Sequence, residues 1–361
     1  MKKKLVHLVY SMGCGGLEKV IVNLINGTHE KVEHVIITLT PEFEMIDVIV
    51  PVIDVFCLEK RPGKDLGCHL RLYKLLKQIS PDVINTYNFG TIEYHVTAFL
   101  AGVKLRVHSD HGHGGDAQDG LNKKNNLIRR VSSFFIHDYV VVSQDLMDWV
   151  TKIVKVKPHR LHLIQNGVEV QPSYTALEKA PAQEKVVCTV GRLDPVKNQS
   201  LLIRAFKELV DKCPVPVKLK IIGDGSERSK LESLTNELNL QEHVEFLGYR
   251  EDIRHQLEQC DVFVLSSHYE AMPMTILETM AVGRPVVTTD VGGIRHFIDD
   301  SVVSFVEPDN KEMLACEILS CVTTFPADKV EKAHKLVFDK YSISAMAERY
   351  LSVYSTTTQS T

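Results

Sequence analysis

The sequence lacks features that define several protein classes. Its eight cysteines are scattered without a CxxC pair, which argues against a zinc site or a disulfide framework and is typical of the reducing cytosol. A net charge of −4 gives no sign of bulk nucleic-acid binding. The apolar run from Leu5 to Tyr10 is too short for a signal peptide or a membrane span. We therefore expect a cytoplasmic protein.

Segments typical of strands and of helices alternate along almost the whole chain. This alternation predicts an α/β fold of parallel sheets with helical crossovers, and 361 residues exceed one ordinary core. From Val168 to Glu184 the alternation lapses into polar sequence that contains proline, which indicates a linker. We therefore predict two Rossmann-like, doubly wound domains that face a cleft, at residues 1–168 and 169–342. The predicted strands are Leu5–Tyr10, His34–Thr40, Asp82–Tyr87, Leu105–Ser109, Tyr139–Ser143, Leu161–Gln165, Lys185–Val190, Leu219–Ile222, Val244–Leu247, Val262–Leu265, Pro285–Thr289 and Val303–Val306.

Two carboxylates follow one of the predicted buried strands. Glu270 lies in the loop after that strand, and Glu278 lies in a helix whose first turn suits Pro273. Free amides of a first helical turn favour an anion such as phosphate, whereas carboxylates accept hydrogen bonds from hydroxyls. The pattern favours a ligand with both phosphate and sugar hydroxyls. The alternative is that Glu270 and Glu278 are ordinary solvated side chains.

A glycine-rich turn, Ser11–Glu18, joins the first predicted strand to the first helix. Glycines there let backbone amides approach a phosphate closely. The spacing fits neither G-x-G-x-x-G nor the phosphate-binding loop with Gly-Lys-Ser/Thr, which weakens a dinucleotide-cofactor hypothesis. The alternative is a turn that needs only a positive φ.

Three histidines, His108, His111 and His113, follow each other closely at the end of another predicted strand. Their spacing fits no common helical zinc pattern. A histidine at the carboxyl edge of a sheet can instead hydrogen-bond a ligand or transfer a proton. An exposed loop histidine is the remaining alternative.

A basic segment from Lys123 to Arg130 comes next, and it includes Lys124, Arg129 and the apolar Leu127. A basic amphipathic helix of this kind contacts anionic membrane surfaces. A solvated helix face would give the same pattern.

Glycine or charge follows almost every strand of the second predicted domain. Arg192 and Lys197 follow its first strand and would neutralise a diphosphate as a leaving group. Gly223-Asp224-Gly225 follows the next strand, and Phe246–Arg250 could lay backbone groups against a base edge. Together these turns would face one cleft.

The chain resembles the family 4 glycosyltransferases, which are retaining enzymes of the GT-B fold. The resemblance covers most of the chain and rests on four segments, the last of which is the Glu270-x7-Glu278 motif. His108–Gly112, with Asp119-Gly120, further resembles bacterial exopolysaccharide sugar transferases. The four segments are Gly15–Glu18, Gly191–Asn198, Gly223–Gly225 and Glu270–Glu278.

The resemblance implies roles for the matching residues. Arg192 and Lys197 would hold the donor diphosphate, Glu278 the nucleotide ribose and Glu270 the donor sugar, while His111 would contact that sugar near the reacting carbon. The remaining donor-binding positions would be Gly15, Gly16, Gly191, Gly223, Tyr249, Arg250, Met274 and Thr275. The last helical stretch, residues 343–356, would pack back onto the first domain.

The resemblance also implies an activity. The protein would transfer a sugar from a UDP- or GDP-sugar to a hydroxyl of a glycan or lipid-linked glycan, with retention and without a cofactor. No Asp-x-Asp pair is present, which fits a reaction without metal. Relatives usually have glycine where Ala271 stands, and a positive φ there would cost about 1 kcal/mol or more. A nucleotide-sugar epimerase and an inactive sugar-nucleotide-binding subunit remain as alternatives.

Overall fold

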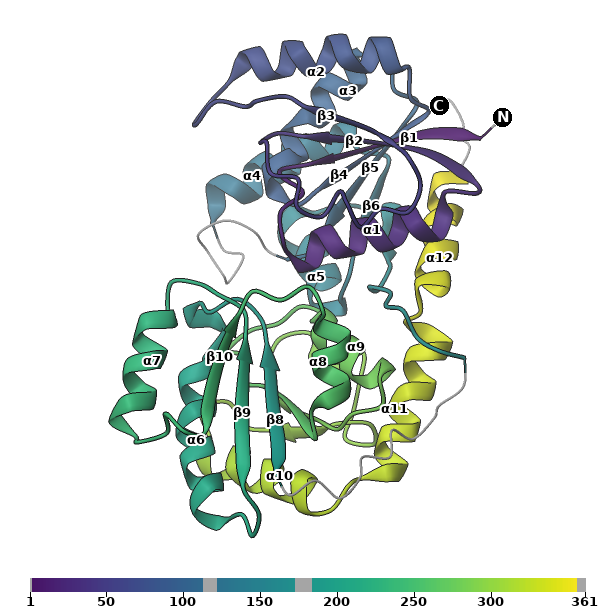
Figure 1. Ribbon diagram of the computed structural model, residues 1–361. Coiled ribbons are helices and arrows are strands. Elements are labelled where there is room, and N and C mark those ends of the chain that lie inside the picture. The colour runs from purple at the N-terminus through teal and green to yellow at the C-terminus, as the bar shows by residue number, and fades with distance from the viewer. Residues whose placement is uncertain (1, 113–121, 173–183, 356–361) are drawn as a thin grey trace. The chain divides into compact units, whose positions relative to one another are not determined.

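The computed structural model describes residues 2–112, 122–172 and 184–355, which form two compact units (Figure 1). The first unit runs to Gly167 and includes the segment that begins at Ile343, and the second unit is Val168–Ser342. The predicted boundary at residue 168 lies one residue further along the chain.

The first unit is built on a seven-stranded parallel sheet of order β3-β2-β1-β4-β5-β6-β7. Strand β3 was missed by the sequence analysis although Val55, Phe56 and Cys57 are apolar; these residues are only half-buried, because β3 is an edge strand of four residues. The strands are β1 (Lys3–Val9), β2 (Val32–Thr38), β3 (Asp54–Cys57), β4 (Val83–Tyr87), β5 (Leu105–Asp110), β6 (Asp138–Val141) and β7 (Leu161–Leu163).

Helices cover both faces of this sheet, and successive residues of β1 alternate between two apolar clusters. Val6 and Leu8 belong to the cluster that includes residues of α2, and Val9 belongs to the cluster that includes residues of α1. The helical segments are α1 (Gly16–Thr28), α2 (Leu66–Ile79), η1 (Phe89–Tyr94), α3 (His95–Leu100), α4 (Lys123–Ser132), η2 (Ser133–Phe135), α5 (Gln144–Trp149), η3 (Val150–Val154), η4 (Pro158–Arg160) and α12 (Ile343–Ser355).

Helix α12 packs on α1 within the first unit (Figure 1). A Cβ atom on Gly27 would lie 2.8 Å from Cγ2 of Ile343 and 3.4 Å from Cβ of Ala347, so glycine allows the two helices to approach closely. Lys3 Nζ also donates to the backbone oxygen of Tyr354 at 2.9 Å.

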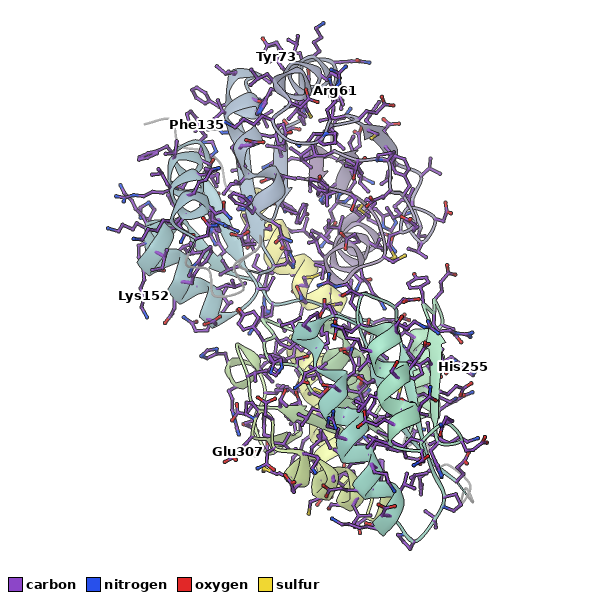
Figure 2. All side chains as sticks on the ribbon, turned by 90° about the vertical axis from the view of Figure 1, so that its left-hand side faces the viewer. Arg61, Tyr73, Phe135, Lys152, His255 and Glu307 are labelled. Atoms are coloured by element: carbon purple, nitrogen blue, oxygen red, sulfur yellow. The ribbon has the colours of Figure 1, made fainter. Side chains whose placement is uncertain are left out.

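The second unit is built on a six-stranded parallel sheet of order β10-β9-β8-β11-β12-β13. His255 on α8 and Glu307 after β13 lie on opposite flanks of this unit in Figure 2. Its elements are β8 (Lys185–Val190), η5 (Pro195–Lys197), α6 (Gln199–Lys212), β9 (Val217–Ile222), α7 (Arg228–Glu237), β10 (Val244–Gly248), α8 (Ile253–Gln259), β11 (Val262–Leu265), α9 (Met274–Ala281), β12 (Val286–Thr289), η6 (Ile294–His296), β13 (Ser304–Val306), α10 (Lys311–Thr323) and α11 (Ala327–Lys340).

The strand order reverses direction once in each sheet. The reversal lies between β1 and β4 in the first unit and between β8 and β11 in the second. In open α/β sheets, ligands bind outside the carboxyl ends of the strands at such a switch point. A functional site is therefore expected in the loops after these four strands.

Candidate active site

An ion pair lies at the switch point of the second unit. Lys197, after β8, places Nζ 2.6 Å from Oε1 of Glu270, after β11. Ser267 donates its hydroxyl to the same carboxylate oxygen at 2.6 Å, and Glu270 is 7% exposed. A buried carboxylate with two partners has a fixed orientation, so this side chain is not the solvated glutamate of the alternative interpretation.

The loop that carries Glu270 is held by its neighbours. Its backbone oxygen accepts a hydrogen bond from the amide of Gly293 at 2.8 Å. Gly292 has a φ of 55°, and a Cβ there would lie 2.0 Å from the same oxygen. The Ser266 hydroxyl ties the loop to the backbone oxygens of Lys197 and Asn198. In the sequence, the adjacent pairs Ser266-Ser267 and Gly292-Gly293 are the only signals of this support, and their contact partners cannot be read from residue identity.

Helix α9 presents its N-terminus beside this loop. Pro273 is its N-cap, and this residue provides no side-chain hydrogen bond to the first-turn amides. These amides and the helix dipole suit an anion. Glu278 is half-buried four residues after Met274, so the two lie on the same helix face. The predicted positions Met274, Thr275 and Glu278 thus come together on one short helix.

Ala271 does not take the strained conformation that we considered. It is 8% exposed, and its φ is not positive. The expected cost of replacing glycine is therefore not incurred.

Arg192 occupies a different environment from Lys197. Its side chain is 76% exposed and pairs with Asp194, Nη2 to Oδ2, at 3.0 Å. The predicted contact of Arg192 with a diphosphate remains a prediction.

The glycines after β8 and β9 serve the packing of two loops. A Cβ on Gly223 would lie 2.0 Å from the backbone oxygen of Gly191, and a Cβ on Gly225 would lie 2.4 Å from that of Leu193. Both have positive φ values, 132° and 159°. Close backbone contact explains these glycines without a ligand, and donor binding by Gly191 and Gly223 remains a prediction.

Tyr249 and Arg250 follow β10, which is the edge strand of the second sheet. Tyr249 is 53% exposed. Arg250 forms two hydrogen bonds of 2.8 Å with Asp252, and the hydrogen bond from the guanidinium holds the pKa of that carboxyl below its usual value. The predicted contact of the Tyr249 and Arg250 backbone with a base remains a prediction.

The glycine-rich turn of the first unit leads into α1. Gly15 is the N-cap with a φ of −156°, so the interpretation as a turn that needs only positive φ is wrong for this residue. A Cβ on Gly15 would lie 2.3 Å from Oε2 of Glu18. The missing side chain of Gly15 therefore makes room for the Glu18 carboxylate in the first turn of α1, and the predicted phosphate contact of Gly15 and Gly16 remains a prediction.

His111 follows β5 at the carboxyl edge of the first sheet. Its amide donates to Oδ1 of Asn88 at 2.8 Å, and its ring lies 6.1 Å from that of Tyr87, centre to centre. In the part of the chain that the structure describes, Nε2 is buried without a hydrogen-bond partner. Burial lowers the pKa of His111 to about 4, so the ring is neutral at pH 7. A neutral imidazole can donate to or accept from a ligand hydroxyl.

A buried charge network lies next to His111 and was missed by the sequence analysis. Asp110 Oδ2 lies 3.3 Å from Arg129 Nε and accepts the Tyr139 hydroxyl. The Arg129 guanidinium also lies over the rings of Phe89 and Trp149. Arg129 is 1% exposed, so its assignment to a membrane-facing basic surface is wrong.

The metal hypothesis for the histidine-rich segment gains no support from the described residues. Within 2–112, 122–172 and 184–355, no group of three or more His, Cys, Asp or Glu side chains is arranged to hold a metal ion. His113, Asp119 and Gly120 lie outside the described residues.

Models of two protein families match this chain. The model described as Glycosyltransferase Family 4 matches residues 14–172, and the model described as Glycosyl transferases group 1 matches residues 174–336. The UDP-Gal:alpha-D-GlcNAc-diphosphoundecaprenol alpha-1,3-galactosyltransferase of Escherichia coli is 30% identical over 259 residues, which cover 67% of this chain and 66% of that protein.

A second relative matches almost the full length. The N-acetylgalactosamine-N,N'-diacetylbacillosaminyl-diphospho-undecaprenol 4-alpha-N-acetylgalactosaminyltransferase of Campylobacter jejuni is 27% identical over 379 aligned residues, with 97% of this chain and 99% of that protein covered. The crystal structure of HepE from Anabaena in complex with UDP is similar in fold, with a TM-score of 0.81 at 20% identity and coverage of 98% of this chain and 100% of that chain.

These findings, with the two parallel-sheet units and the site geometry, identify the class of protein as a glycosyltransferase. The chain belongs to the family 4 glycosyltransferases, and its fold is GT-B. The predicted fold class and family are confirmed. In the part of the chain that the structure describes, no helix combines the length and the apolar character that a bilayer crossing requires.

Proposed function

We propose that the protein transfers a sugar from a UDP-sugar to a hydroxyl of a lipid-linked glycan, with retention of the anomeric configuration and without a metal ion. The E. coli and C. jejuni relatives are named for acceptors that carry a diphosphoundecaprenol group. The E. coli relative is also named for UDP-Gal, and HepE was crystallised with UDP. These names favour UDP over GDP, which the sequence left open.

The Lys197–Glu270 pair is the observation that carries the proposal. Its 2.6 Å contact fixes an ammonium group on the loop that leads into α9, whose N-cap residue Pro273 provides no side-chain hydrogen bond to the first-turn amides. Positive charge and amide dipoles at one place stabilise a departing diphosphate. Glu270 has a second carboxylate oxygen with which to accept a sugar hydroxyl. Glu278, on the same helix, would accept from the ribose.

The reaction proceeds on one face of the sugar. The bond from the anomeric carbon to the diphosphate oxygen breaks, and the bond to the acceptor oxygen forms on the same side. The acceptor proton passes to the departing diphosphate. His111 contributes a neutral imidazole with a buried Nε2, which suits a hydrogen bond to the donor sugar.

A cavity in the first unit suits the acceptor. It has a volume of about 320 Å³ and is lined by Tyr10, Lys60, Phe89, Glu93 and Ile128, among others. Tyr10 and Phe89 follow β1 and β4, at the switch point of that sheet. Apolar rings mixed with a few charged groups are typical of small-molecule sites, and a sugar offers matching faces and hydroxyls.

Helix α4 and the segment after it suit contact with an anionic membrane. Lys123, Lys124 and Arg130 are exposed beside apolar side chains that are also exposed. The apolar side chains are Leu127 at 62%, Val131 at 52% and Phe134 at 79%. Phe135 and Lys152 mark this flank of the first unit in Figure 2. Cations beside apolar groups bind anionic lipid surfaces, where lipid-linked acceptors are found.

The membrane proposal is tested by vesicle flotation. Vesicles with phosphatidylglycerol should carry the wild-type protein, and the Phe134→Ser variant should float less. Phosphatidylcholine vesicles are the control. Wild-type protein that stays in the soluble fraction with both lipids would remove membrane contact from the proposal.

The transfer proposal is tested by thermal unfolding with UDP and GDP, followed by a transfer assay. UDP at one hundred times its Kd should add about 2.7 kcal/mol of stability. The Lys197→Ala variant should lose this effect, whereas the Lys207→Ala variant, which replaces a half-buried lysine paired with Asp211 on α6, should keep it. Transfer to an N-acetylglucosaminyl diphosphate with a short lipid should give a product with the donor's anomeric configuration by NMR.

Each outcome of these assays decides one part of the proposal. An inverted product contradicts retention, and activity that requires added Mg²⁺ after EDTA treatment contradicts the metal-free reaction. Conversion of the donor without an acceptor would favour the epimerase. Donor binding without turnover on any acceptor would favour the inactive subunit.

A further inference from the structure

Asn88, directly after β4, has a backbone conformation that asparagine rarely adopts. Its φ is 57° and its ψ is 176°. This combination belongs to a region that only glycine occupies without strain. Strained residues of this kind persist where surrounding contacts hold them, and they cluster at functional sites.

The contacts of Asn88 connect the carboxyl ends of β4 and β5. Its amide donates to the backbone oxygen of Ser109 at 2.9 Å. Its side-chain Oδ1 accepts the amide of His111 at 2.8 Å. The bond to Ser109 requires only the backbone amide of residue 88, and a glycine at this position would donate it without strain. The asparagine side chain therefore adds the bond to His111.

Neighbouring contacts make His111 dependent on this bond. The residue before it, Asp110, is held by Arg129 and Tyr139. His111 itself follows the last residue of β5, so the sheet ladder no longer fixes its backbone. The hydrogen bond from the His111 amide to Asn88 therefore fixes the backbone one residue beyond the end of β5.

We propose that Asn88 is a positioning residue, which accepts strain in order to fix the backbone of His111 and thereby aim its imidazole. The inference rests on the proposed function, in which His111 contacts the donor sugar. It assigns to Asn88 no contact with the substrate.

The test combines two substitutions with two measurements. Asn88→Gly relieves the strain and removes the side-chain acceptor, while Asn88→Asp keeps an acceptor oxygen. The first measurement is amide hydrogen exchange of His111 by NMR. The second is the rate of UDP release from UDP-galactose, UDP-glucose, UDP-N-acetylglucosamine and UDP-N-acetylgalactosamine, which needs no acceptor.

A matched control is present in the second unit. Asn239 also has a positive φ, 55°, and it lies between α7 and β10, away from the carboxyl edge. Asn239→Gly makes the same chemical change without a bond to His111. This control should leave both the exchange of His111 and the rate of UDP release unchanged.

We expect Asn88→Gly to speed exchange of the His111 amide at least tenfold and to lower kcat by about 10- to 100-fold, with a melting temperature equal to or above that of the wild type. Asn88→Asp should restore kcat to within about threefold. In a His111→Ala background, Asn88→Gly should have no further effect on kcat, because the residue it acts through is gone.

Two results would overturn the inference. One is unchanged exchange of the His111 amide in Asn88→Gly. The other is an activity of Asn88→Asp as low as that of Asn88→Gly. If the exchange changes as expected but the wild type releases no UDP, or His111→Ala is fully active, the proposed function fails instead.

Discussion

Acidification should destabilise the first unit through buried neutral histidines. His34 is 4% exposed, and its ring lies between His7 and the Thr28 hydroxyl. Burial lowers its pKa to about 4, and burial also lowers the pKa values of His7 and His95. An unfolded histidine has a pKa of about 6.5. The unfolded chain therefore binds protons first as the pH falls.

The sign and size of the effect follow from proton linkage. A group whose pKa is lower in the folded state contributes stability above the unfolded pKa and loses it as the pH falls toward the folded pKa. For His34, with values of about 4 and 6.5, lowering the pH from 7.5 to 5 removes about 2 kcal/mol from the free energy of unfolding. His7 and His95 add to this loss with the same sign.

The single tryptophan makes this loss measurable for the first unit. Trp149 is 7% exposed on α5, so its fluorescence in urea follows the unfolding of that unit. The His34→Gln variant, compared with the wild type at pH 7.5 and at pH 5, should lose about 2 kcal/mol less on acidification. His255→Gln, at an exposed position of α8, is the control and should behave as the wild type. Equal losses in wild type and His34→Gln would refute the reasoning.

Three further predictions concern single residues at or near the two switch points. Gly292→Ala places a Cβ 2.0 Å from the backbone oxygen of Glu270, so UDP-sugar turnover should fall at least about tenfold; unchanged kcat/KM would contradict the role of this turn. Arg129→Met leaves Asp110 charged and buried, and Trp149 fluorescence in urea should show a loss of about 3–5 kcal/mol, most of which the added Asp110→Asn change should restore. Gly223→Ala should destabilise the second unit by about 2 kcal/mol or more, since its Cβ would meet a backbone oxygen at 2.0 Å; circular dichroism in urea checks this, and a wild-type midpoint would contradict it.

The sequence predicted the elements that have a strong pattern. Twelve of the strands carry β-branched or apolar runs, and their carboxyl ends place Glu270 and Lys197 at one edge of the sheet. Strand β3 was missed although Val55–Cys57 are apolar, because it is a short edge strand whose four residues are exposed or only half-buried.

The missed features depend on contacts between distant residues. Arg129 looks like any helix cation in the sequence, and only its approach to Asp110 across the fold shows that it is buried. Asn88 has no local signal, since its φ is imposed by its bonds to Ser109 and His111. From the sequence, alanine instead of the usual glycine at position 271 would cost conformational energy if its φ were positive. The φ of Ala271 decides this, and φ cannot be read from residue identity.

The assignment of α12 to the first unit has a consequence for synthesis on the ribosome. The whole of Val168–Ser342 separates α12 from the rest of its unit in the chain. At about 5–20 residues per second, translation of that segment takes roughly 10–35 s. During this delay the surface of α1 around Gly27, which Ile343 covers in the finished protein, is left without its partner. The unit that begins first therefore completes its packing last, and its nascent chain offers chaperones an apolar surface that the mature protein hides.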